Sequence, residues 1–499
     1  MKKATLRYSL FFTIFSVAIL QRFVHPGDLY ISYFTDDFYY YYKISDNLIK
    51  SGISSFNGIH LTNGYHPLWM LIIATIQFIT GGGALAFIGI SLVICCLVTA
   101  TYILYDKISI FIYGDYAHVW ITSALSAIFI GVLAKGGMEI PLAAFFIALF
   151  FFRCLKSPLE NQSIAELLIT GFIASIVFLS RIDAIIPIFI YIATTFINKK
   201  IPIIKIIFIS LGASLIAIYV AINIFIFETI LPISGMAKQL KTTYIPSLRP
   251  LKTITSPGLL NIFYTWPAII VAILAAFKLK NSILTGNEKA VVVSLLLHPV
   301  ILFSILCVKS DWPTWIWYQY PFATFFCIAA PILINENNIK NIYKKQIKQM
   351  LPLAAFSFSI FGFIGVARTN SDAMAIYNAA NAIQQFSITH PGIYGMGDRA
   401  GMPGYFLNYS VIQLEGLTEN KQFLQKIQTS ENLLSVLKEM RVNYYITTNP
   451  KHENDCYVTR EPVQAGPASP VMRGKFCAPP IARFKFGGEE TLIFSIVTN

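Results

Sequence analysis

Charged residues are scarce in this chain of 499 residues. Asp, Glu, Lys and Arg together make up 13% of it, against roughly 25% in ordinary globular domains, whereas hydrophobic residues make up 55%. A composition this apolar excludes both an ordinary soluble protein and an intrinsically disordered one. It predicts an α-helical polytopic membrane protein whose apolar surface is covered by lipid rather than enclosed in one core.

A regular cysteine framework is also missing, although the chain contains seven cysteines. Only Cys456 and Cys477 share a polar segment. They could form a disulfide if that segment lies outside the cytosol, and the sequence leaves both states open. The remaining cysteines lie in or beside apolar runs, where a thiol behaves as a small hydrophobic group: Cys95, Cys96, Cys154, Cys307 and Cys327.

Apolar runs long enough to cross a membrane, or nearly so, recur along the first 366 residues. The first run ends without the small residues of a signal-peptide cleavage site, so we expect it to be retained. The run at 67–79 is short and predicts a half-buried or interfacial helix instead. About eleven spans are expected, at 6–24, 84–105, 119–135, 139–156, 164–180, 182–197, 201–227, 258–278, 289–308, 318–334 and 350–366.

Basic residues indicate the orientation of these spans. The chain has 38 Lys and Arg against 25 Asp and Glu, a formal net charge of +13. With a cytoplasmic N-terminus, most basic clusters fall on the cytoplasmic side, as the positive-inside rule requires, and no nucleic-acid partner is needed to explain them. A cell inner membrane is the expected location. The clusters are Arg153 and Lys156, Lys199 and Lys200, Lys278 and Lys280, and 340–348.

The last 130 or so residues lose the apolar runs and predict a small soluble α/β domain, periplasmic or extracellular. We divide the chain into a transmembrane module, 1–366, and this domain, 367–499. The module includes a first outer loop with juxtamembrane helices at 25–83. In the domain, helices are expected at 373–388 and 419–440, and strands at 411–414 and 444–446.

Two adjacent carboxylates follow the first span. Thr35 is a favourable N-cap, which places Asp36 and Asp37 in the first turn of an amphipathic helix at the membrane surface. They could simply complement the helix dipole, but one carboxylate would do that. The pair instead favours a catalytic base with a raised pKa, or ligands for a divalent cation such as Mg²⁺ or Mn²⁺.

Other polar residues are expected on the same outer face. They are His66 before a helix that starts with proline, Glu139 at the start of another helix, and Arg181 with Asp183 between two spans. A turn, a first-turn helix acid and a structural ion pair would each be an ordinary explanation. Charge at a membrane boundary is costly, however, so we treat these residues as candidate substrate-binding groups.

The outer loop 228–257 carries a basic cluster that opposes the positive-inside rule. Lipid-linked phosphate would explain it, and contact with anionic lipids or a solvated loop is the alternative. The tryptophan-rich segment 311–318 is more typical of an aromatic belt than of a sugar-binding platform. The basic residues of the loop are Lys238, Lys241, Arg249 and Lys252.

These motifs together resemble the GT-C glycosyltransferases, polytopic enzymes that transfer sugars from polyprenyl-phosphate donors on the non-cytoplasmic face. The resemblance implies that Asp36 or Asp37 acts as base or metal ligand, and that Arg181, Lys238 and Lys241 bind the donor phosphate. Ile182 stands where relatives often have proline. The motifs extend over most of the chain: DDFYYYY, TNGYHPLW, GMEIPL, SRIDA, LPISGMAK, GDRAGMPGYF and IQLEGL.

The activity implied by the resemblance is an inverting hexosyl or pentosyl transfer. A carboxylate, Asp36 by preference, removes a proton from an acceptor hydroxyl, and the oxygen attacks the anomeric carbon as lipid phosphate leaves. The acceptor would be a glycan, a lipid or a protein, and membrane lipids would surround the enzyme. The alternative is a membrane transporter or lipid-linked sugar flippase, for which broken mid-membrane helices and internal repeats would be expected.

Overall fold

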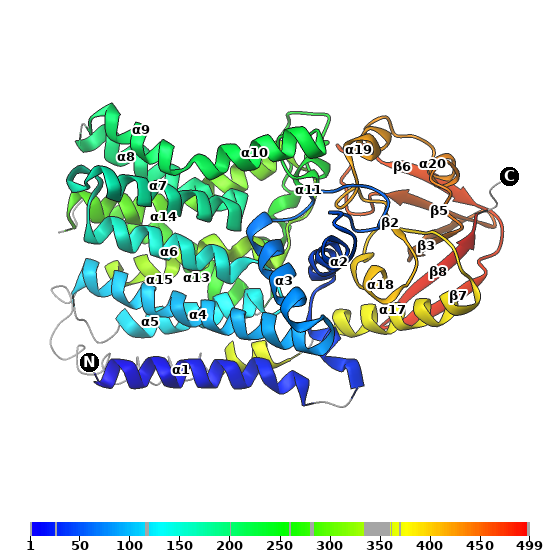
Figure 1. Ribbon diagram of the computed structural model, residues 1–499, viewed down its shortest axis with the longest axis horizontal. Helices are drawn as coiled ribbons and strands as arrows, with labels where there is room; N and C mark the ends of the chain where they lie inside the picture. The colour runs from blue at the N-terminus through cyan, green and yellow to red at the C-terminus, as the bar shows by residue number, and fades with distance from the viewer. Residues whose placement is uncertain are drawn as a thin grey trace.

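The computed structural model has a helical bundle at one end and an α/β domain at the other (Figure 1). The N-terminus lies at the end of the bundle that is farthest from the α/β domain. The C-terminus lies in the α/β domain. This arrangement confirms the predicted helical chain with a small C-terminal sheet domain. The structure describes residues 2–24, 27–114, 119–199, 201–258, 261–279, 284–333, 360, 362–368 and 371–496.

Apolar helices build the bundle. In the described ranges, only α4 and α14 are long and apolar enough to cross a membrane by themselves, and α9 with α10, bent by 52°, would add a third span. The helices are α1 (Lys2–Leu20), α4 (Gly83–Tyr113), α5 (Val119–Ala134), α6 (Ile140–Lys156), α7 (Ile164–Ser180), α8 (Ile185–Lys199), α9 (Ile203–Gly212), α10 (Ser214–Phe227), α13 (Trp266–Leu279), α14 (Gly286–Lys309) and α15 (Tyr320–Ala329).

The prediction of eleven spans is therefore not confirmed, and helix length is the reason. The 17 residues of α7 measure about 26 Å at 1.5 Å per residue, whereas a hydrocarbon core is roughly 30 Å thick. The predicted span at 201–227 shows a second reason: sequence hydropathy continues across the break between α9 and α10, where the helix is interrupted. Of the predicted span at 350–366, only 360 and 362–366 are described. The basic residues at 200, 280 and 340–348 lie outside the described residues.

Two helices of the first outer loop lie between the bundle and the α/β domain (Figure 1). As predicted for 67–79, α3 (Pro67–Thr80) is half-buried: Trp69 is inaccessible and Phe78 is 75% exposed. The prediction that α2 (Asp36–Ser51) lies at the membrane surface stays a prediction, but protein rather than lipid covers its aromatic face. Its aromatic residues 38–42 are all buried, because α3 packs on one side of α2 and α18 of the α/β domain on another.

The α/β domain contains a five-stranded sheet in the order β2-β1-β3-β8-β7, in which β1 runs parallel to β2 and β3 and β8 runs antiparallel to its neighbours. A second, antiparallel sheet has the order β4-β5-β6. The strands are β1 (Tyr394–Met396), β2 (Val411–Gln413), β3 (Tyr444–Thr448), β4 (Lys451–Glu453), β5 (Cys456–Glu461), β6 (Met472–Phe476), β7 (Ala482–Phe486) and β8 (Glu489–Ser495).

Most of the elements predicted for this domain are present. The strands at 411–414 and 444–446 are β2 and β3, and the helix at 373–388 is α17 (Ser371–Thr389). The helix predicted at 419–440 is two helices, because Asn432 caps the second by accepting a hydrogen bond from the Ser435 amide at 3.2 Å. The helices are α17, α18 (Gly401–Phe406), α19 (Lys421–Gln428) and α20 (Leu433–Glu439). Two short helices, α11 (Ile233–Ala237) and α12 (Lys252–Thr255), lie in the basic outer loop.

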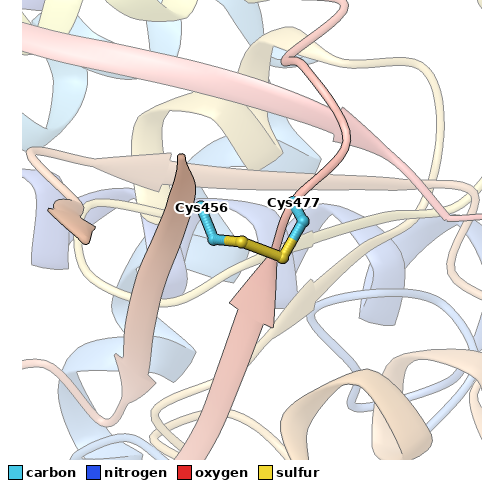
Figure 2. Close-up of a disulfide and its surroundings, with 2 residues drawn as sticks. All are labelled: Cys456 and Cys477. Carbon is cyan, nitrogen blue, oxygen red and sulfur yellow. A yellow bond between two sulfur atoms is a disulfide. The ribbon is translucent and has the colours of Figure 1, made fainter. Parts of the chain in front are cut away.

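Cys456 and Cys477 form a disulfide (Figure 2). It joins the start of β5 to the chain that follows β6, across a sequence separation of 21 residues. Of the two states that the sequence left open, the structure has the oxidised one.

Replacing both of these cysteines by serine is expected to lower the free energy of unfolding of the α/β domain by about 3 kcal/mol, because the bond restricts a loop of this length in the unfolded chain. Thermal unfolding of the purified protein measures the change, with Cys96→Ser, an exposed free cysteine, as the control. Labelling of both Cys456 and Cys477 by a thiol reagent in unreduced membranes would contradict the pairing.

Candidate active site

The site begins where the first outer loop turns into α2. Thr35 occupies the predicted N-cap position, but its side chain does not cap the helix. Instead its amide and hydroxyl both donate to the carbonyl oxygen of Gly136, at 3.0 and 3.2 Å. The loop that precedes α6 therefore fixes the first turn of α2, which carries Asp36 and Asp37.

Asp36 binds the α/β domain. Its two carboxylate oxygens accept hydrogen bonds from the backbone amides of Gly401, at 2.9 Å, and Met402, at 2.7 Å, at the start of α18 where a negative charge is favoured. A side chain at Gly401 would meet the carbonyl oxygen of Asp36, so glycine is needed for this close approach. Burial raises the pKa of Asp36 to about 7, although the two hydrogen bonds oppose the change.

Asp37 is the more available of the two carboxylates. Among the described residues, no donor hydrogen-bonds to it, and it lines two separate cavities. Burial raises the pKa of Asp37 to about 6 against the effect of the Lys238 ammonium, and the carboxylates of Asp398 and Glu139 raise it further. A half-accessible carboxylate with this pKa is partly protonated near neutrality, which suits a general base.

The first cavity, here called the bundle cavity, has a volume of about 300 Å³. It brings together most of the residues that the sequence predicted: Asp37, His66, Glu139, Arg181, Asp183 and Lys238. Apolar side chains form another part of its wall: Ile182, Ile186, Leu231, Leu302, Ile305 and Leu306. A charged pocket beside an apolar wall suits a phosphate attached to a lipid chain.

Arg181 is the centre of a buried ionic network in this cavity. It pairs with Glu139 and, at 2.7 Å, with Asp183, and its guanidinium lies 4.8 Å from the centre of the Tyr318 ring. Glu139 also accepts a hydrogen bond from the Tyr41 hydroxyl at 3.1 Å. Two carboxylates and an aromatic face therefore hold the guanidinium in one orientation.

His66 and Lys238 lie near this network. The His66 ring lies 3.6 Å from the Glu139 carboxylate, and burial lowers its pKa, so it is neutral near pH 7. Burial alone would also lower the pKa of Lys238, but the Tyr318 phenol and the Asp37 carboxylate raise it overall. Lys238 is therefore a cation beside Asp37, and the Tyr318 ring centre is 5.9 Å from its ammonium.

The second cavity, here called the interdomain cavity, has a volume of about 220 Å³ and lies between α2 and the α/β domain. Asp37, Tyr40, Lys238, Trp317 and Leu417 line both cavities. Its other wall residues include both predicted and unpredicted groups: Asp36, Trp312, Trp315, Asp372, Asp398, Arg399, Glu415 and Gln464.

Lys241 is placed elsewhere. Its ammonium donates to the carbonyl oxygens of Ile245, of Cys307 at 3.2 Å and of Val308 at 3.3 Å, and it lines neither cavity. Since a cation is favourable at the C-terminal end of a helix, Lys241 stabilises the end of α14. The sequence identified a basic loop but could not separate Lys238, which lines the bundle cavity, from Lys241, which holds the end of α14.

Contacts between the first loop and the α/β domain hold the interdomain cavity in place. The His60 ring nitrogen lies 2.7 Å from a Glu419 oxygen, and the other Glu419 oxygen accepts from Asn57 at 2.8 Å. A side chain at Gly64 would meet the carbonyl oxygen of Leu417. The motifs TNGYHPLW and IQLEGL therefore meet in space, which explains the glycine of the first.

The residues Asp398, Glu415 and Trp317 were missed as site residues. Asp398 lies in the motif GDRAGMPGYF and Glu415 in IQLEGL. The resemblance of these motifs to the GT-C glycosyltransferases was the signal that could have identified both residues. Burial raises the pKa of both carboxyl groups, that of Glu415 well above its usual range. For Trp317 the sequence favoured an aromatic belt over a sugar-binding platform, and the structure shows that it is 8% exposed and lines both cavities.

A divalent cation at Asp36 and Asp37 fits this arrangement poorly. Both oxygens of Asp36 already accept hydrogen bonds from backbone amides. The Lys238 ammonium already lowers the pKa of Asp37 by its positive charge. The described ranges also contain no group of three or more His, Cys, Asp or Glu side chains placed to hold a metal ion. We derive no catalytic step through a metal.

A helical bundle whose acidic first outer loop lies under a C-terminal α/β domain is the GT-C fold. Among solved structures, the chain is similar to ArnT from Cupriavidus metallidurans bound to undecaprenyl phosphate, with a TM-score of 0.55 and 10% identity over 99% of this chain and 98% of that one. The apo state of that protein matches with a TM-score of 0.54 and 11% identity, over 89% and 93% of the two chains.

The archaeal oligosaccharyltransferase AglB from Archaeoglobus fulgidus, in complex with an inhibitory peptide and a dolichol-phosphate, matches with a TM-score of 0.51 and 11% identity, over 89% of this chain and 69% of that one. No family model and no curated protein matches the sequence. At such identities the likeness concerns the fold, and the fold predicted from the motifs is confirmed. Function has to be argued from the site.

Proposed function

We propose that this protein is an inverting glycosyltransferase that moves a sugar from a polyprenyl-phosphate donor to an acceptor hydroxyl. One observation carries the proposal: Asp37 lies in the wall that two chemically different cavities share. A transferase needs its base at the meeting point of two substrates, since proton removal and attack involve both. A transporter would need one continuous path instead.

The bundle cavity is the proposed donor site. Arg181 and Lys238 are the cations on its wall, and they would hold the donor phosphate and stabilise its charge as it leaves. Its apolar side chains suit the first isoprene units of the lipid. The lipid phosphates bound in the ArnT and AglB structures support this choice of donor.

The interdomain cavity is the proposed acceptor site, and Asp37 is the proposed base. The carboxylate takes the proton of an acceptor hydroxyl, the hydroxyl oxygen forms a bond to the anomeric carbon, and the bond from that carbon to the phosphate oxygen breaks. The products are a glycoside, a protonated Asp37 and a polyprenyl phosphate next to Arg181 and Lys238. Attack from the side opposite the leaving phosphate inverts the anomeric carbon.

For location we propose a cell inner membrane, with the N-terminus cytoplasmic and the α/β domain periplasmic or extracellular. The opposite positions of the N-terminus and the α/β domain (Figure 1) and the disulfide support this orientation. Both cavities would then open outside the cytoplasm.

The decisive experiment uses purified protein in lipid vesicles with a panel of polyprenyl-phosphate hexoses and pentoses. Release of free polyprenyl phosphate together with a new glycoside supports the proposal and identifies the sugar. Movement of a labelled lipid-linked sugar across the vesicle membrane, without glycoside formation, would favour the flippase instead. Adding EDTA to active vesicles tests for a divalent cation at Asp36 and Asp37, and full activity is expected in its presence.

The rate of transfer should depend on pH through Asp37. Because the base must be deprotonated, kcat/KM should rise with pH, reach half its maximum near pH 6, the pKa of Asp37, and level off above it. Lys238 lowers that pKa, so Lys238→Met should move the midpoint to higher pH as well as slowing the reaction. The control is Asp46→Asn on the same helix, which removes an exposed pair with Lys50. An unshifted midpoint in Lys238→Met would contradict the assignment.

A further inference from the structure

Three tryptophans form an aromatic wall in the interdomain cavity. The rings of Trp315 and Trp317 stack with centroids 6.0 Å apart and an interplanar angle of 26°, and Trp312 completes the wall. Trp315 is 36% exposed, whereas the other two are buried. An aromatic face packs well against the C–H face of a sugar ring, whose hydroxyl groups remain free to hydrogen-bond around it.

Polar contacts on both sides hold this tryptophan segment in position. The Asp311 carboxylate accepts hydrogen bonds from the Ser247 hydroxyl and, at 2.8 Å, from the Ala468 amide. The Thr314 hydroxyl donates to the carbonyl oxygen of Pro250 at 2.7 Å. The aromatic wall is therefore anchored before any ligand arrives, which reduces the entropy cost of binding.

Carboxyl groups dominate the remaining wall of the cavity. Asp36, Asp37, Asp372, Asp398 and Glu415 face two cations, Lys238 and Arg399. Arg399 is itself paired with Glu489, and Lys238 also lines the donor cavity. An acceptor that carried phosphate or carboxylate groups would meet more carboxyl groups than cations here, whereas hydroxyl and amino groups would find hydrogen-bond partners.

A third cavity of about 180 Å³ lies on the other side of Asp398 and Arg399, which line it too. Its wall is polar and includes Thr447, Asn449 and Glu461. The Glu461 carboxyl is buried: its Oε1 accepts from the Tyr445 hydroxyl at 3.0 Å, but its Oε2 has no hydrogen-bond partner in the described structure. A buried polar atom without a partner is costly, and because Glu461 lines this cavity, a donor group of a ligand there would satisfy it.

We infer that the acceptor is a carbohydrate without phosphate or carboxylate groups, with its reacting sugar on the tryptophan wall and its next sugar beside Glu461. This inference deepens the proposed function and rests on it for the role of the cavity. Each of the two cavities is smaller than the roughly 300–1,000 Å³ of typical ligand pockets, which suits one sugar unit in each.

Tryptophan fluorescence of the vesicle-bound protein tests this binding without donor or turnover. The probes are maltose, lactose and cellobiose, each beside its 6-phosphate form, together with glucose and chitobiose. We expect saturable quenching by at least one neutral or amino disaccharide. This disaccharide should bind more tightly than glucose, and its 6-phosphate form should bind at least tenfold more weakly than the disaccharide itself. A 6-phosphate form that binds equally well, or a panel that gives no saturable quenching, would overturn the inference.

Variants separate the two walls. Trp315→Ala should weaken binding of the best disaccharide about tenfold, the loss of roughly 1.4 kcal/mol of ring contact, with Trp266→Phe, an equally exposed tryptophan outside both cavities, as the control. Glu461→Gln should weaken the disaccharide more than glucose. Binding of polyprenyl phosphate, measured separately, should be unchanged in both. If the wild-type protein does not bind polyprenyl phosphate at all, the proposed donor site is contradicted. This result can be told apart from a failure of the acceptor inference, which the sugar-binding measurements test.

Discussion

Asp37→Asn is expected to slow glycosyl transfer by about 10²–10⁴-fold while leaving donor binding intact, because positioned bases contribute rate factors of that size. Asparagine has nearly the same shape but cannot take the proton. Transfer at saturating substrates measures kcat, and retention of labelled polyprenyl phosphate measures donor affinity. The pH limb near 6 should disappear from whatever activity remains. Near-normal turnover in this variant would exclude Asp37 as the base.

Asp36→Asn is the matched control, and it should behave differently. The change removes one of two charge-assisted hydrogen bonds to the start of α18 and should lower the free energy of unfolding by about 1.5–3 kcal/mol. Any activity loss should follow from loosening of the α/β domain over α2. A folded Asp36→Asn protein without turnover, beside an active Asp37→Asn protein, would reverse the assignment and restore the carboxylate that the sequence favoured.

The local sequence pattern predicted several elements correctly, because the residues that define those elements lie within a few positions of one another. Thr35 followed by an acidic pair predicted where α2 begins, and the length of the run at 67–79 predicted that α3 does not span a membrane. The strand β8 was missed because it lies between β7 and β3, and its partner β3 is more than 40 residues away in the sequence. A strand in the middle of a sheet is defined by partners that are distant in the sequence.

The candidate site could be predicted only in part for the same reason. Glu139, Arg181 and His66 were identified because charge at a membrane boundary is costly wherever it occurs. Their mutual contacts were not, and neither was the difference between Asp36 and Asp37. That difference depends on Gly401 and Met402, which lie more than 360 residues away from Asp36 in the sequence. Which side of a helix another domain covers cannot be read from that helix alone.

Arg181→Met should be the most damaging change in the bundle. It leaves the carboxylates of Glu139 and Asp183 without their cation, and breaking a buried pair in this way costs about 3–5 kcal/mol of unfolding free energy. It also removes a proposed phosphate ligand, which should weaken donor binding about 10–100-fold. Thermal unfolding in detergent and retention of labelled polyprenyl phosphate measure the two effects separately.

The two effects of losing Arg181 can be separated with a second substitution. Glu139→Gln in the Arg181→Met background removes one of the two carboxylates that have lost their cation. The free energy of unfolding should therefore recover in part, whereas donor affinity should not recover. Arg181→Lys keeps the charge but loses the planar fork that contacts Glu139 and Asp183, so it should bind donor better than Arg181→Met and worse than the wild type. Recovery of donor binding together with stability in the double variant would mean that Arg181 only supports the fold, and Lys238 would then be the main phosphate ligand.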